Sequence, residues 1–161
     1  MPLWEACREP VVPVPNGGDR YFNDRLGYEM VFDGSRQKWF SHSVFSVEFF
    51  ASTDTKTGDK YTRHNGQVTD FLVGAGTITK IAVVADEKTN AHAFNVCVDT
   101  GTGKYTCDLS VESQSNAPRA FLRDTEDFDF SRGLMSVVKT KADAKGWSSC
   151  TITYRLRADE L

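Results

Sequence analysis

The larger part of the chain, from about residue 43 onward, consists of short apolar runs separated by turn signals. In the run 149–157, Cys150, Ile152, Tyr154 and Leu156 alternate with threonine and arginine. One apolar and one polar face is what a strand of an antiparallel sandwich needs. The pattern predicts about eight strands, the number in a jelly roll, at residues 44–51, 68–73, 77–85, 92–99, 104–111, 119–123, 134–140 and 149–157.

A smaller three-stranded meander is predicted ahead of this domain, with strands at 19–22, 27–32 and 38–40. The dipeptide Asp33-Gly34 lies between two of these strands and predicts a tight hairpin turn in which both positions have positive φ. A meander of this size is not stable alone, so we expect it to lean on the next domain or on a partner. Its aromatic residues can pack together: Tyr21, Tyr28, Phe32 and Trp39.

The first 17 residues hold four of the five prolines, at Pro2, Pro10, Pro13 and Pro15. Proline lacks a backbone donor, which excludes a helix or a central strand here and predicts an extended strap. Apolar residues of the strap are candidates for docking on another chain or, as an alternative, on its own domain: Trp4, Val11, Val12 and Val14. We therefore expect an all-β chain with a docking strap (1–17), a β-hairpin module (18–42) and a jelly-roll-like β-sandwich (43–161).

Composition narrows the class of protein. The 161 residues are 40% hydrophobic and 12% aromatic, with a net charge of −3, which argues against a disordered chain and against a basic surface for nucleic acid. The sequence start shows neither the basic nor the apolar region of a secretory signal, and no apolar stretch reaches the length of a membrane span. We expect folding in a cytoplasm and no insertion into a membrane.

The four cysteines are too scattered for a zinc site. A disulfide between Cys97 and Cys107 is the tempting alternative. If the apolar faces of runs 92–99 and 104–111 lie together, however, strand alternation places these two sulfurs on opposite sides of the sheet. We therefore expect reduced thiols, in agreement with cytoplasmic folding.

No motif of a catalytic or cofactor site is present: there is no serine elbow, phosphate-binding glycine loop or His-Glu-x-x-His pattern. The three histidines are far apart, and structural roles are expected for them. We predict no cofactor and no enzymatic activity. One acidic run is a weak calcium candidate, because hard cations prefer several oxygens from one loop, although a solvated turn is the better interpretation: Asp124, Glu126, Asp127 and Asp129.

Sugar binding would need an aromatic platform flanked by polar loop residues, because a pyranose face stacks on a ring while its hydroxyls take hydrogen bonds. Two loops combine these groups. The first contains Tyr61, Arg63 and His64, and the second contains Trp147. Trp147 can equally well be a lid over the core.

The segment 18–41 resembles a short module of bacteriophage tail-fibre and virion-spike proteins, which reads approximately Gly-Asp-Arg-x-Phe-Asp, Leu-Gly-Tyr, aromatic-Asp-Gly-Thr/Ser and then Trp. Asn23 stands where the module usually has Asp, and Gln37 and Lys38 lengthen the approach to the tryptophan. The residues that carry the resemblance, together with Tyr21, form the expected hairpin module: Phe22, Leu26, Gly27, Tyr28, Phe32, Asp33, Gly34, Ser35 and Trp39.

The resemblance implies a non-enzymatic protein of the virion surface, a fibre, spike or head decoration, that docks through its N-terminal arm and exposes the sandwich. Its partners would be other virion proteins of the capsid, tail or portal region, sister subunits of a homotrimer, and a host-surface polysaccharide. Two alternatives stay open. One is a capsid or tail decoration or cement protein with only a structural role, and the other is a free-standing carbohydrate-binding or depolymerising domain.

Overall fold

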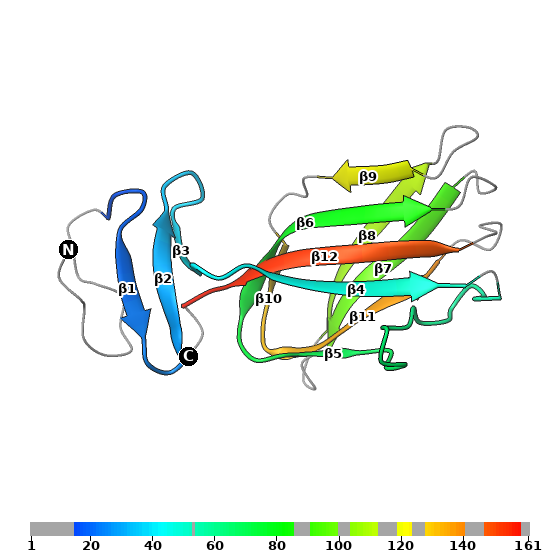
Figure 1. Cartoon of the computed structure of the whole chain (residues 1–161), viewed down its shortest axis with the longest axis horizontal. Helices are drawn as coiled ribbons and strands as arrows, with labels where there is room; N and C mark the ends of the chain where they lie inside the picture. The colour runs from blue at the N-terminus through cyan, green and yellow to red at the C-terminus, as the bar shows by residue number, and fades with distance from the viewer. Residues whose placement is uncertain are drawn as a thin grey trace.

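The structure, a computed structural model, describes residues 15–52, 54–85, 91–99, 104–112, 119–123, 128–140 and 147–158. Every regular element in these residues is a β-strand, and all strand pairs are antiparallel. No helix long and apolar enough to cross a membrane occurs in this part of the chain. A small three-stranded sheet lies at one end of a two-sheet sandwich (Figure 1), which confirms the predicted all-β fold.

The small sheet is the predicted meander, and its strands are β1 (Arg20–Asn23), β2 (Tyr28–Asp33) and β3 (Lys38–Ser41), paired in the order β1-β2-β3. Its own core consists of Tyr21, Met30, Phe32 and Trp39, all at most 7% exposed. The Trp39 ring meets the Tyr21 ring edge-on at 5.0 Å between centroids and the Phe32 ring at 5.3 Å. The aromatic residues therefore pack together as predicted, except that Tyr28 lies at the border of this cluster.

The turn between β2 and β3 differs from the predicted two-residue hairpin. It spans residues 34–37, and the positive φ falls on Gln37 (55°) and not on Gly34. The Asp33 carboxylate organises the turn, because its Oδ1 accepts hydrogen bonds from Ser35 N (3.0 Å), Ser35 Oγ (2.6 Å) and Arg36 N (3.0 Å). An aspartate that binds the backbone two and three residues later replaces the left-handed pair that the dipeptide suggested.

Replacing Asp33 with alanine should destabilise the protein by about 1 kcal/mol, since the turn loses hydrogen bonds to a carboxylate. Partial burial raises the Asp33 pKa, but hydrogen bonds from Ser35 and Arg36 and the Arg36 charge outweigh it and lower the pKa from 3.8 to about 2. The contribution is therefore complete above the unfolded pKa and is lost as pH falls toward 2. NMR titration of the side chain measures this. A titration midpoint near 3.8 would contradict the predicted pKa. Asp24→Ala in the neighbouring turn is the control for the loss of stability.

The sandwich contains two sheets that face each other. One has the strand order β10-β6-β12-β4, with β9 also paired to β6, and the other has the order β5-β11-β7-β8. The bounds are β4 (Phe45–Ala51), β5 (Asp70–Leu72), β6 (Gly76–Ala85), β7 (Ala91–Asp99), β8 (Lys104–Glu112), β9 (Arg119–Arg123), β10 (Phe128–Phe130), β11 (Gly133–Lys139) and β12 (Ser148–Leu156).

These strands form nested pairs: β4 with β12, β5 with β11, β6 with β9 and β10, and β7 with β8. From the outermost pair to the innermost, successive pairs alternate between the two sheets. The chain is therefore one long antiparallel hairpin wrapped around a common core. Because β9 and β10 share the partner β6, they act as one interrupted strand. The result has eight strand positions and is a jelly roll.

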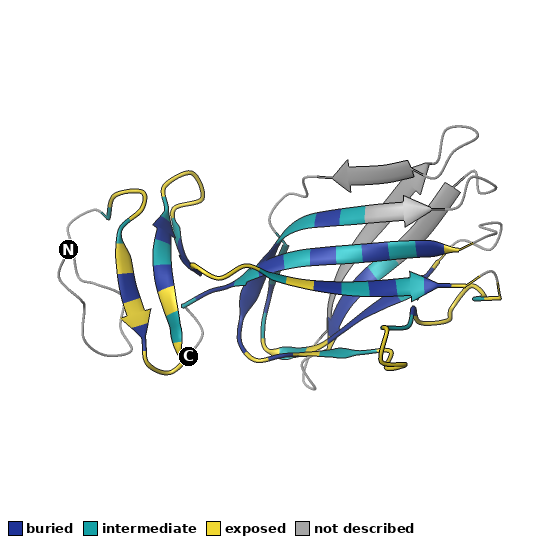
Figure 2. Cartoon of the chain, in the orientation of Figure 1, coloured by how far each residue is buried: buried dark blue, intermediate teal, exposed yellow. Residues whose placement is uncertain are grey.

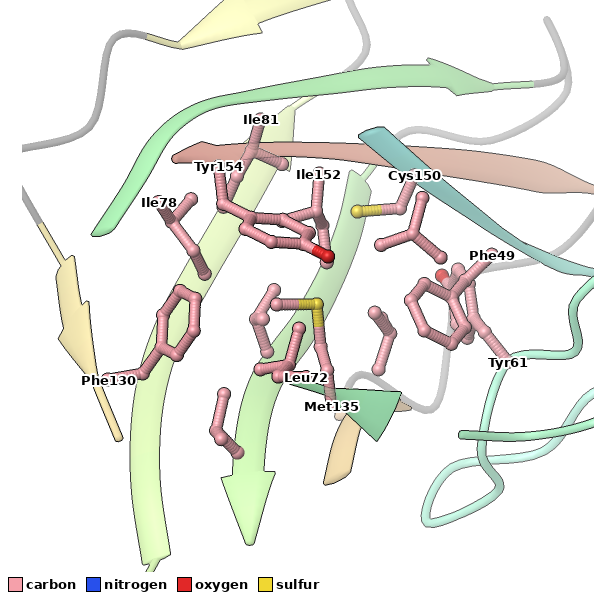
Figure 3. Packing of buried hydrophobic residues seen from close by; sticks show 14 of the residues in the cluster. Phe49, Tyr61, Leu72, Ile78, Ile81, Phe130, Met135, Cys150, Ile152 and Tyr154 are labelled. Carbon is pink, nitrogen blue, oxygen red and sulfur yellow. The ribbon is translucent and has the colours of Figure 1, made fainter. Parts of the chain in front are cut away.

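The core lies between the sheets and follows strand alternation. Every second residue of β12, from Ser148 to Leu156, is buried, as Figure 2 shows along β4 and β12. Burial of one such apolar side chain stabilises the fold by roughly 1.5–3 kcal/mol. Figure 3 shows part of this cluster, with Phe130 and Ile78 at one end and Phe49 and Tyr61 at the other. Its members are Val47, Phe49, Ala51, Tyr61, Leu72, Ile78, Ile81, Val96, Val98, Phe130, Met135, Val137, Cys150, Ile152, Tyr154 and Leu156.

The cysteines follow the predicted strand parity. The backbone register pairs Cys97 with Thr106 and Cys107 with Val96, so the two cysteines do not oppose each other. Cys97 and Cys150 are buried free thiols. Burial raises the pKa of the Cys150 thiol far above its ordinary value, which keeps it protonated and unreactive.

Candidate functional site

The hairpin module rests on the sandwich through a shared apolar contact. Leu26 and Tyr28 pack against the cores of both parts. The Tyr28 ring meets the Phe45 ring edge-on at 5.3 Å, Phe45 stacks on Tyr154 at 5.4 Å, and Tyr154 meets Phe130 edge-on at 5.7 Å. Aromatic packing thus continues from the module into the sandwich without a break.

Backbone contacts fix the same junction. Ser41, at the end of β3, accepts a hydrogen bond at its carbonyl from Arg155 Nε (2.8 Å), and its hydroxyl accepts one from Leu156 N (3.0 Å). Phe40 forms an antiparallel bridge with Arg157, and the Arg155 guanidinium lies 5.3 Å from the centre of the Phe40 ring. The meander therefore leans on its own sandwich, which is one of the two supports that its small size requires.

Asp129 in β10 is the ionic centre of the junction. It accepts hydrogen bonds from Thr77 Oγ1 (2.6 Å) and Lys38 Nζ (3.0 Å), and Arg157 Nε lies 3.9 Å from it. Partial burial raises the Asp129 pKa, but the Thr77 and Lys38 hydrogen bonds and the Arg157 and Lys38 charges outweigh it and lower the pKa. Arg157 is 6% exposed and donates to the carbonyls of Gly76 and Phe130.

This geometry corrects the calcium candidate at its described member. Asp129 lies in a strand, where its carboxylate pairs with Lys38 and Arg157, and not in an acidic loop. The other candidate ligands, Asp124, Glu126 and Asp127, lie outside the described residues. Within the described part of the chain there is no group of three or more histidine, cysteine, aspartate or glutamate residues placed to hold a metal ion.

At the opposite end of the sandwich, the β4–β5 connection closes the gap between the sheets. Thr62 pairs with Phe50 of β4, while Tyr61 N donates to Val137 O of β11 (2.7 Å). Tyr61 therefore points into the core, and its hydroxyl is 2.9 Å from Ser148 Oγ of β12. This hydrogen bond joins the two loops that the sequence indicated for sugar binding.

The same connection surrounds an open hollow of about 480 Å³, which we call the distal hollow. Its walls are fixed from within. Ser52 N donates to Thr55 Oγ1 (3.0 Å), and Lys56 N donates to Asp59 Oδ2 (2.9 Å). Lys139, only 4% exposed, donates from Nζ to Thr55 O (2.8 Å). The residues that line the hollow are Ser52, Asp54, Thr55, Asp59, Lys60, Thr62 and Val68.

The four residues predicted for sugar binding have different surroundings. Tyr61 is 1% exposed, so its ring cannot serve as a platform, and this expectation is wrong. The Arg63 guanidinium is held by Asp70 at 2.7 Å. His64, with its side chain 75% exposed, lies 3.3 Å from Glu48 and beside the Phe50 ring. Trp147 is 42% exposed and is not a lid over the core.

The expected hairpin-module residues divide between core, turns and surface. Tyr21 and Trp39 are buried, Leu26 and Tyr28 lie at the junction, and Phe22 is 44% exposed. Asp33 and Gly34 form the turn, and Gly27 takes a positive φ of 73° in the other turn, where glycine is favoured. The expected docking residues lie outside the described residues: Trp4, Val11, Val12 and Val14.

Sequence reasoning missed two features. Strand β10 was hidden in an acidic run, although Phe128-Asp129-Phe130 shows strand alternation. The distal hollow was missed because its walls are brought together by the Thr62 and Lys60 bridges, which no local pattern reveals. The available signal was the short spacing of Ser52, Asp54 and Asp59 in a glycine-containing loop.

Comparison with known proteins gives similarity in overall structure only. No family model matches the sequence, and no curated protein matches it. The globular domain of zebrafish complement 1qA protein is similar with a TM-score of 0.43 and 7% identity, covering 68% of this chain and 94% of that one. A virus-like particle of the extra small virus of the giant freshwater prawn Macrobrachium rosenbergii is similar with a TM-score of 0.30 and 13% identity, covering 92% of this chain and 86% of the viral one.

Proposed function

We propose that the chain is a non-enzymatic bacteriophage virion-surface protein, a fibre or spike, that docks through its N-terminal arm and presents the sandwich to the host surface. The observation that supports this most is the fixed junction. Leu26 and Tyr28 pack against both cores, and Ser41 and Lys38 bind the sandwich directly. A module held in this way sets the position of the whole sandwich relative to whatever the arm contacts.

The two ends of the molecule suit separate tasks. The module occupies one end, and the β4–β5 connection and the start of β12 lie at the other (Figure 1). Loops on a rigid scaffold are the usual place for recognition, because they can vary without disturbing the core. In this proposal the strap residues bind another virion protein, three copies of the chain associate, and the distal loops meet a host polysaccharide.

The docking part is tested by particle incorporation. A chain lacking residues 1–14 should retain the thermal unfolding of the sandwich but be absent from purified particles, as measured by mass spectrometry. Sedimentation of the intact protein should give about three times the 18.0 kDa chain mass. Normal incorporation of the shortened chain would refute docking by the strap.

A decoration or cement protein is the second candidate, and one observation favours it. Phe71 of β5 and Leu134 of β11 pair directly across the strands and are 61% and 44% exposed, and Val73 beside them is 55% exposed. Contiguous exposed apolar residues are typical of surfaces that a neighbour covers. Binding of the purified protein to host cells separates the candidates, because a cement protein should bind the particle only.

A further inference from the structure

The distal hollow has the chemistry of a ligand site, and two of its charged side chains have no structural task. Its walls are held by Lys139, by backbone bridges and by the Thr55 and Asp59 side chains, whereas the side chains of Asp54 and Lys60 take no part. Within the described part of the chain, neither the Asp54 carboxylate nor the Lys60 ammonium makes a hydrogen bond or ion pair with another residue. A free acceptor and a free donor therefore share one open, preorganised depression.

The groups in the hollow match a polyhydroxylated ligand. A sugar hydroxyl can donate to Asp54 and accept from Lys60 at the same time, and the Thr55 and Thr62 hydroxyls add further polar partners. Val68, 39% exposed, supplies an apolar wall for the C–H face of a ring. A volume of about 480 Å³ is ample for one or two pyranose rings.

The backbone register brings the predicted aromatic platform close to one residue that lines this depression. Ser148 pairs with Ala51 at the end of the β4–β12 ladder, so Trp147 and Ser52 are the next residues outward on the two chains. Ser52 lines the hollow, and Trp147 is 42% exposed. By backbone register, the sequence-predicted platform at Trp147 is thus the neighbour of Ser52, which lines the hollow.

The charges select among sugars. The hollow contains two carboxylates, Asp54 and Asp59, against one ammonium, Lys60, on a chain of net charge −3. A carboxylated sugar would be repelled by this balance, whereas a neutral sugar loses nothing. We propose that the distal hollow binds a neutral pyranose of a polysaccharide, with Asp54 and Lys60 as its polar contacts and Trp147 as its stacking platform. This inference rests on the proposed attachment function.

NMR of the full ¹⁵N-labelled chain tests the assignment, with glucose, galactose, mannose and N-acetylglucosamine as neutral probes and glucuronate and sialic acid as acidic ones. At least one neutral sugar should shift amides of residues 52–62 and the Trp147 indole, and the acidic sugars should not. Asp54→Ala and Lys60→Ala should each weaken that binding roughly tenfold, since each removes a charged hydrogen-bond partner. Both residues are exposed, so the fold should be unaffected.

Lys56→Ala is the matched control for Lys60→Ala, and Asp24→Ala is the matched control for Asp54→Ala. Each control removes a charge of the same sign from an exposed turn residue outside the lining of the hollow. Absence of any neutral-sugar shift, equal binding of acidic sugars, or binding unchanged in the Asp54 and Lys60 variants would overturn the assignment. Particle incorporation of the same variants is measured separately and should be normal. A failed sugar test with normal incorporation refutes the ligand assignment alone, whereas absence of the intact chain from particles refutes the attachment function.

Discussion

Replacing Gly76 with alanine is expected to destabilise the protein by about 3 kcal/mol, because the new methyl group has no room. An added Cβ would lie 2.5 Å from Phe130 Cζ and 2.7 Å from the carbonyl oxygen of Arg155. Gly76 pairs with Phe130 on one side and with Leu156 on the other, so the strands on both flanks would have to move. Urea unfolding followed by tryptophan fluorescence measures the loss.

Gly74→Ala is the matched control, two residues earlier in the same chain. Its Cβ would meet Leu26 Cδ2 at 3.1 Å, and this is the mobile end of a side chain, which can give way. We expect a cost of less than about 1 kcal/mol at this position. Equal unfolding midpoints for the two variants would show that crowding at Gly76 does not decide the stability.

Arg157→Met should cost about 3 kcal/mol, since removal of the buried guanidinium leaves two carbonyl acceptors without their donor. The carbonyls of Gly76 and Phe130 lose their guanidinium donors, and Asp129 loses a neighbouring positive charge. The Asp129 pKa, which Arg157 helps to lower, should rise in this variant. Unfolding in guanidinium chloride measures the stability, and NMR titration of the Asp129 carboxyl measures its pKa.

Arg155→Met provides the comparison two residues earlier in the chain. Arg155 is only partly buried and donates from Nε to one carbonyl, that of Ser41, so its loss should cost about 1 kcal/mol. Arg157→Lys keeps the charge but not the planar donor fork and should fall between the two methionine variants. If Arg155→Met proved the more damaging change, the junction would depend on the meander contact and not on the buried guanidinium.

Much of this architecture is readable from the sequence, because the alternation that defines each strand is local. The run 149–157 predicted β12 almost to the residue. Strand parity alone correctly predicted that Cys97 and Cys107 do not pair across the two strands. The turn at Asp33-Gly34 was predicted as a hairpin but with the wrong geometry, since side-chain capping by Asp33 competes with a left-handed glycine turn.

The parts that could not be read depend on contacts between distant segments. Tyr61 is followed by the polar sequence Thr62-Arg63-His64-Asn65, which is typical of a surface loop. Its burial results from the backbone hydrogen bond to Val137 and the side-chain hydrogen bond to Ser148, both far away in the chain. The role of Asp129 likewise depends on Lys38 and Arg157, which no local pattern places beside it.

The nested jelly roll also determines how the molecule would bear a mechanical load. β4 leaves the module and β12 returns to it, where Ala158 packs against the module core, so both outermost strands run between the two ends of the protein. Under the proposed function, tension between a particle at the module end and a host surface at the distal hollow would act along these strands. Because the Ser52 wall of the hollow directly follows β4, the load would pass along the covalent backbone of that strand and would not be carried across the hydrogen bonds of the β4–β12 ladder.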